Sequence, residues 1–303
     1  MVLKISLDGS EIITRLMSDF NKQKGDNWDL IIEGKSSLLD FKLKEVWRYR
    51  DLLFMFVKRD FVSFYKQTIL GPLWFFIQPI FTTIVFTFVF GNLAGLSTDG
   101  LPQSLFYLAG ITAWNYFADC LTKTSTVFKD NANIFGKVYF PRLIMPLSIV
   151  TSNLVRFGVQ FMLFVVIMIY YSYQGANFQI TNAIFLFPLL IVLMAMLGLG
   201  LGLVITAMTT KYRDLSFLVS FSVQLLMYGT TVIYPLSAAP EKYRYLIELN
   251  PMTGIIEAFR FAFLGQGHLT FGSIAYSACF ALGITILGVL IFNKTERSFV
   301  DTI

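Results

Sequence analysis

Long apolar segments constrain this chain more than any other feature of its sequence. A helix that crosses the hydrocarbon core of a bilayer needs roughly 20 predominantly apolar residues. Six segments qualify or nearly qualify, and Asn115 and Asp119 interrupt the second of them. We therefore predict an all-α integral membrane protein with six transmembrane helices, at about 72–92, 104–121, 145–172, 182–208, 215–234 and 271–292.

The distribution of Lys and Arg predicts how these helices are oriented. Of the 24 basic residues, 20 lie before the first segment, in the second and fourth connections, or in the C-terminal tail. The connections on the opposite side hold three, all within residues 235–270. Because cytoplasmic loops carry the excess of positive charge, we expect both termini in the cytoplasm. The net charge of +5 then indicates topology and an anionic lipid surface, not a nucleic-acid partner.

A charged stretch at residues 45–70 precedes the first span. On a helical wheel, one side carries the apolar residues Leu53, Phe54, Val57, Phe61, Phe64 and Tyr65. The other side gathers the cations Arg48, Lys58, Arg59 and Lys66. Such a stretch is too charged to span, so we expect an amphipathic helix in the cytoplasmic interface, ended by Gly71-Pro72. Residues 1–44 are then a separate cytoplasmic segment, and residues 71–303 form the membrane domain.

The four cations of this helix have two interpretations. They anchor the helix to anionic lipid, or they gather a lipid-linked phosphate, since Lys and Arg are natural phosphate partners. The two roles are compatible.

The segment at about 235–270 is long and irregular for a loop. It contains Pro235, Pro240 and Pro251, and its apolar run Gly254–Leu264 is too short to span. We predict a re-entrant outer hairpin between spans five and six, with its irregular backbone buried in protein or facing water.

Arg156 is the one basic residue inside a predicted span, roughly 16 Å into the third. A charge at that depth must face a partner or a hydrated cavity. Asp119 and Glu257 are the candidate partners. Arg156 is either half of a structural ion pair or a contact for an anionic substrate group.

The sequence contains none of the residue sets that enzymes of this size use. Gly34-Lys35-Ser36 resembles the end of a phosphate-binding loop, but Asp29 stands where that motif needs glycine. The single histidine, His268, cannot form a metal cluster with the two cysteines. We therefore expect transport rather than chemistry, with no cofactor in this chain.

Several motifs together resemble those of a known family. They lie, in chain order, at Tyr65–Trp74 with Gln78-Pro79, Gly110–Phe117, Asn131–Pro146, Lys211–Asp214, Tyr234-Pro235, Asn250-Pro251 and Glu296–Asp301. Their order and spacing resemble the membrane subunits of polysaccharide ABC exporters, the type-2 ABC permeases for O-antigen, capsule and teichoic acid. The resemblance covers residues 45–303, which makes 71–303 the permease domain.

This resemblance implies a homodimer in the bacterial inner membrane with two cytoplasmic ATPase subunits, which hold ATP and Mg. Such permeases move a glycan linked to polyprenyl diphosphate, or a comparable lipid-linked polymer, to the outer leaflet. The interface helix would be the cytoplasmic gate, and Tyr234, Pro235, Asn250 and Pro251 would lie near the outer mouth. The coupling loop at about 122–144 and the turn after the fourth span would contact the ATPase through Asn131, Phe135, Lys137, Tyr139, Pro141, Arg142, Lys211, Tyr212, Arg213 and Asp214.

Three other functions remain open from the residues, one of them a scaffold or assembly subunit with no transport pathway. A type-2 ABC exporter of drugs or small lipids would have a closed apolar seam instead of a wide polar and aromatic channel. A membrane enzyme of glycan assembly would act without an ATPase.

Overall fold

The computed structural model describes residues 43–66, 68–135, 140–212 and 214–300, and every regular element in these ranges is helical. The phosphate-loop-like Gly34-Lys35-Ser36 and nearly all of the predicted 1–44 segment lie outside the described residues.

The predicted interface helix forms as two helices, α2 (Leu43–Arg48) and α3 (Arg50–Tyr65). Its packed face includes Leu52, Leu53 and Phe56, and the Phe56 ring lies 5.7 Å from that of Phe140. Phe54, which the helical wheel placed on the apolar face, is 61% exposed and does not belong to this packed face. The packed ridge is shifted toward Phe56, whose ring also supports the long side chain of Arg59.

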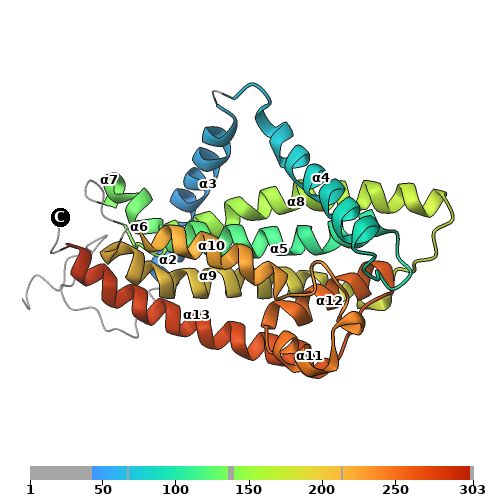
Figure 1. Ribbon diagram of the computed structural model, residues 1–303. Helices are drawn as coiled ribbons and strands as arrows, with labels where there is room; N and C mark the ends of the chain where they lie inside the picture. Colours follow the sequence, from blue (N-terminus) through green and yellow to red (C-terminus); the bar gives the residue numbers. More distant parts are fainter. Residues whose placement is uncertain (1–42, 67, 136–139, 213, 301–303) are drawn as a thin grey trace, which may run out of the picture. The chain divides into compact units, whose positions relative to one another are not determined.

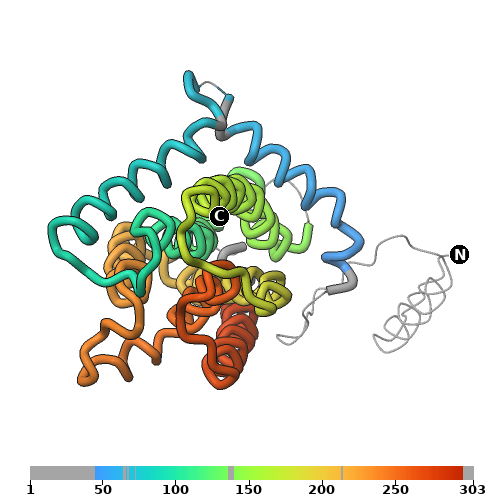
Figure 2. The backbone as a smooth tube through the Cα atoms, turned by 90° about the vertical axis from the view of Figure 1, so that its right-hand side faces the viewer, coloured from blue at the N-terminus to red at the C-terminus, as the bar shows by residue number. Residues whose placement is uncertain are grey.

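The chain turns after α3 and enters the first span as predicted near Gly71. A 3-10 turn, η1 (Gly71–Leu73), leads into α4 (Trp74–Phe86), which continues as the π-helix η2 (Thr87–Leu93). Gly71 has a φ of 49°, which an L side chain rarely adopts. Figures 1 and 2 show α3 and α4 rising toward each other as an arch over α8 (Ile144–Tyr173).

The centre of the bundle is α5 (Gln103–Ser125), which packs against α4, α8, α9 and α12. From Leu105 to Phe117 every residue except Asn115 is buried. This helix is the predicted second span, and its burial explains its polarity, because a helix surrounded by other helices does not need a lipid-facing surface.

Four helical stretches are long and apolar enough to cross a membrane: Trp74–Leu93, Ile144–Tyr173, Asn182–Lys211 and Phe271–Thr295. The third joins the 3-10 turn η3 (Asn182–Leu186) to α9 (Phe187–Lys211), and the fourth belongs to α13 (Phe271–Val300). Helix α10 (Leu215–Tyr228) has 14 residues, or about 21 Å, short of a hydrocarbon core of about 30 Å. The predicted fifth span is therefore not one continuous helix, and the total of six spans stays a prediction.

The predicted hairpin contains η4 (Leu236–Ala238), α11 (Glu241–Glu248) and α12 (Pro251–Leu264). Helix α12 is almost entirely buried and packs against α13, α5 and α9. The short helices α6 (Val127–Asp130) and α7 (Ala132–Phe135) follow α5. Figure 1 shows α11 and α12 at one end of the bundle and α6 and α7 at the other.

Candidate functional site

A pocket of about 210 Å³ lies where the arch meets the two helices beneath it. It is lined by Asp60, Phe61 and Ser63 of α3, Phe75 of α4, Lys123 of α5, and Ile149, Ser152, Asn153 and Arg156 of α8. We call this the arch pocket. Its lining combines two cations, Lys123 and Arg156, with hydroxyl and amide groups and with the carboxylate of Asp60, which pairs with Arg59.

Arg156 reaches the arch pocket from α8. Its Nη1 lies 3.6 Å from Oδ2 of Asp119, and its guanidinium lies over the Phe75 ring at 5.1 Å. Of the two predicted partners, Asp119 is therefore confirmed. Glu257 is not a partner of Arg156, because its carboxylate pairs with Arg260 on its own helix.

Lys123 and Asn153 are pocket residues that the sequence reasoning missed. Lys123 Nζ donates to Asn153 Oδ1 at 2.9 Å, and Asn153 is 1% exposed. The predicted second span ended at residue 121, but α5 continues to Ser125, which turns Lys123 into a lining residue. The signal was the four-residue spacing from Asp119 to Lys123, which puts both on one helix face. Ser152 Oγ is buried and has no hydrogen-bond partner among the described residues.

The cations of the interface helix differ in their surroundings. Arg59 binds Asp60 at 2.7 Å and stacks on Phe56 at 4.8 Å, so the carboxylate that breaks the basic face neutralises its neighbour. The remaining predicted members of this face are exposed: Arg48, Lys58 and Lys66.

The predicted coupling loop is partly folded onto the bundle. Phe135 is 9% exposed, and its ring lies 5.4 Å from Phe128 and 5.7 Å from Phe140. Arg142 lies over the Phe135 ring at 5.6 Å, and Asn131 Nδ2 donates to the Val127 carbonyl. Pro141 is half-buried. Lys137 and Tyr139 lie outside the described residues.

The predicted turn after α9 is close to the same loop. Thr209 of α9 donates its hydroxyl to the Ser125 carbonyl at the end of α5, and α6 packs against α9. Lys211, Tyr212 and Asp214 are exposed, while Arg213 lies outside the described residues. The structure thus brings the two segments with predicted ATPase contacts to one end of the bundle.

The predicted outer-mouth residues have local structural roles. Asn250 Oδ1 accepts from the Met252 amide at 3.0 Å and caps α12, whose first residue is Pro251. Tyr234 donates to the Tyr228 carbonyl at 3.2 Å, and Pro235 is buried.

Comparison with known proteins gives a consistent result over most of the chain. A family model described as ABC-2 type transporter matches residues 51–264, from the start of α3 to the end of α12. The O-antigen export system permease protein RfbA of Klebsiella pneumoniae is 27% identical over 252 residues, covering 83% of this chain and 94% of that protein. The Myxococcus xanthus protein of the same name is 26% identical over 265 residues, covering 86% and 98%. The inner membrane transport permease YadH of Escherichia coli (strain K12) is 27% identical over 196 residues, covering 62% and 75%.

Proposed function

Because this chain belongs to the ABC-2 type transporter family, we propose that it is the permease subunit of an ATP-driven exporter that moves a lipid-linked polysaccharide across the bacterial inner membrane. The O-antigen export permeases that it resembles align with it over more than four-fifths of its length, which favours a glycan, most simply O-antigen, as the cargo. The working unit is a homodimer with two cytoplasmic ATPase subunits.

The excess of Lys and Arg supports an orientation with the α6–α7 end in the cytoplasm. In this orientation α3 lies at the cytoplasmic surface, at the level of lipid phosphates. The arch pocket is then open to a lipid-linked substrate before translocation.

The arch pocket is the observation that carries the proposal. Lys123 and Arg156 both line it, and Asn153 and Ser152 add polar groups. Its volume of about 210 Å³ leaves room for a phosphate group. The pocket therefore suits the charged link between lipid and glycan, while the glycan itself needs a wider path between two copies.

Burying a phosphate without partners is prohibitive, so a permease must offer cations in exchange for water. Arg156 pairs with Asp119 at 3.6 Å, which is longer than a close charge-assisted hydrogen bond. A phosphate that enters the pocket would compete with this carboxylate for the guanidinium.

The test is complementation of a strain that lacks this chain but keeps its ATPase. Wild type should restore surface polysaccharide, and Lys123→Gln with Arg156→Gln should leave lipid-linked glycan in the inner leaflet at normal protein abundance. Surface glycan that is unaffected by deleting the chain, together with efflux of small hydrophobic compounds, would favour the drug or lipid exporter. Glycan synthesis by the purified chain without ATPase would favour the membrane enzyme.

A further inference from the structure

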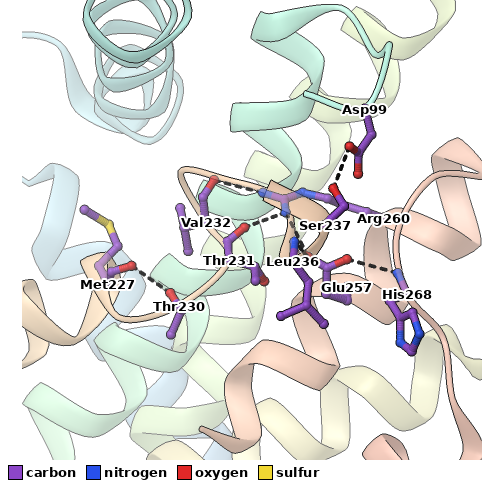
Figure 3. A network of polar contacts seen from close by, with 10 residues as sticks. All are labelled: Asp99, Met227, Thr230, Thr231, Val232, Leu236, Ser237, Glu257, Arg260 and His268. Atoms are coloured by element: carbon purple, nitrogen blue, oxygen red, sulfur yellow. Dashed lines mark hydrogen bonds and ion pairs between the residues drawn. The ribbon is translucent and has the colours of Figure 1, made fainter. Parts of the chain in front are cut away.

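A buried ion pair lies on α12, and neither of its residues lines the arch pocket. Arg260 of α12 is 1% exposed, and its Nη1 lies 3.5 Å from Glu257 Oε1 (Figure 3). The same guanidinium donates to two successive carbonyls after α10, those of Thr231 and Val232, the latter at 2.8 Å. Arg260 therefore ties α12 to the 229–237 segment.

The guanidinium also contacts α5. Its Cζ lies 3.6 Å from the centre of the Phe106 ring. One turn further along α5, Gly110 leaves the space that the group occupies, because a Cβ there would lie 2.7 Å from Arg260 Nη2 and 3.0 Å from the Val232 oxygen. The first half of α5 thus packs closely against the Arg260 side chain.

Glu257 extends the connection in the opposite direction. Its Oε1 accepts from the Leu236 amide at 3.4 Å, and its Oε2 accepts from the His268 amide at 3.0 Å. Gly267, with a φ of 129°, lies so close that a Cβ would be 2.7 Å from the Glu257 carbonyl oxygen. The carboxylate therefore joins the start of η4 to the chain that leaves α12.

A second contact joins the loop before α5 to the end of the 229–237 segment. Ser237 Oγ donates to Asp99 Oδ1 at 2.7 Å (Figure 3).

Burial lowers the pKa of Arg260 to about 10, which leaves the guanidinium charged at neutral pH.

We propose that Arg260 and Glu257 are positioning residues that hold the α11–α12 hairpin, the 229–237 segment and the first half of α5 as one rigid block. A buried charge with this many partners cannot shift without leaving some of them unpaired, which is costly. The hairpin is thus not a separate lid. Movements that open a path take place outside the block, at the arch of α3 and α4.

The first test closes the block covalently. Asp99→Cys with Ser237→Cys, in a Cys279→Ser background, places two thiols where the side chains already touch. The disulfide should form, and export should be the same with oxidant and with reductant. The proposal is overturned if the disulfide does not form, or if oxidation stops export and reduction restores it. The single-cysteine variants are the controls.

The second test weakens the block without leaving Glu257 unpaired. Arg260→Lys keeps the charge but lacks the planar fork that serves both carbonyls. Amide hydrogen exchange in 229–237 and 251–264 should accelerate on the order of tenfold, and export should fall. Arg244→Lys, on exposed α11, is the matched control and should change neither. Unchanged exchange in Arg260→Lys contradicts the proposal.

The export measurements rest on the proposed function, whereas the exchange measurement does not. Accelerated exchange in a chain that exports no polysaccharide would therefore refute the proposed function alone.

Discussion

Arg156 and Arg260 are both arginines within the helical bundle, but their side chains differ in exposure. Arg260 and Glu257 are 1% and 2% exposed, whereas Arg156 and Asp119 are 20% and 38% exposed. A partly exposed ion pair is typically worth at most about 1 kcal/mol, while removing one member of a buried pair costs about 3–5 kcal/mol. Stability therefore depends on Arg260 far more than on Arg156.

The first prediction follows for Arg156→Ala. Asp119 keeps its hydration when its partner is removed, so membrane abundance should stay normal while export of an anionic lipid carrier falls. Immunoblots of membranes beside surface glycan distinguish the outcomes. Asp119→Asn, which removes the pair but keeps the cation, should retain export. Loss of the Arg156→Ala protein would instead support a structural pair, and full abundance with full export would exclude both roles.

The second prediction concerns two glycines in long helices. Gly110→Ala puts a Cβ against Arg260 and the Val232 carbonyl, and such overpacking should destabilise by about 1–3 kcal/mol. Gly158→Ala on α8 has open space around the new carbon, so helix propensity should stabilise by up to about 1 kcal/mol. Thermal unfolding in detergent measures both. Equal effects of the two substitutions would contradict the close approach at Gly110.

The sequence identified Arg156, with Asp119 as one of two candidate partners, because a charge deep in a span must be compensated. Arg260 escaped notice because it was counted among the three cations of an outer loop. Its role depends on two backbone carbonyls and a glycine from distant parts of the chain. No local sequence pattern predicts these tertiary contacts. Asn153 was missed for the same reason, since its role depends on the hydrogen bond that it accepts from Lys123, which the sequence does not show.

At the scale of elements, hydropathy located the helices that face lipid and was less informative about the others. Helix α5 is more polar than its neighbours because it lies at the centre, and α10 is short because the buried segment from Thr230 to Ile233 continues its path without helix. Hydropathy reports how apolar a segment is, and it cannot distinguish a central helix from a broken span. The all-helical class and the break near Gly71 were predictable from local signals alone.

The third prediction tests the packed face of α3. Phe56 packs against Phe140, so Phe56→Ala should destabilise the docking of α3 by roughly 1–3 kcal/mol. Phe54→Ala changes an exposed ring on the same helix and should leave stability unchanged. Rates of protease cleavage within α3 report the difference. A larger effect at Phe54 would contradict the docking of α3 through Phe56.

The fourth prediction concerns the exposed cations of α3. Replacing Lys58, Arg59 and Lys66 by Gln should weaken export while leaving membrane insertion intact. Because Asp60 already holds Arg59, the Lys58→Gln, Lys66→Gln double variant should account for most of the loss. Surface glycan is measured against immunoblotted protein. Normal export in the triple variant would leave only an anchoring role for this helix.

At the scale of the whole membrane domain, the two ends of the bundle carry different kinds of structure. One end has α6, α7 and the exposed turn after α9, and the other has α11 and α12 (Figure 1). Helix α12 carries the buried pair of Arg260 and Glu257. In the proposed orientation, the exposed polar end meets the ATPase and the rigid end faces outward. ATP-driven movement is then delivered at the cytoplasmic end, beside the arch.

The last prediction tests this arrangement with three single cysteines in the Cys279→Ser background, which leaves only buried Cys120. Asn133 and Lys211 are exposed at the end with α6 and α7, and Ser237 is exposed at the other end. Cysteines at the first two positions should cross-link to the ATPase subunit through a short bifunctional maleimide, and Ser237→Cys should not. In intact cells, a maleimide that reaches only the periplasm should label Ser237→Cys alone. Labelling of Asn133→Cys and Lys211→Cys in those cells would reverse the topology, and the ATPase contact would fail with it, because the same end of the bundle cannot face both compartments.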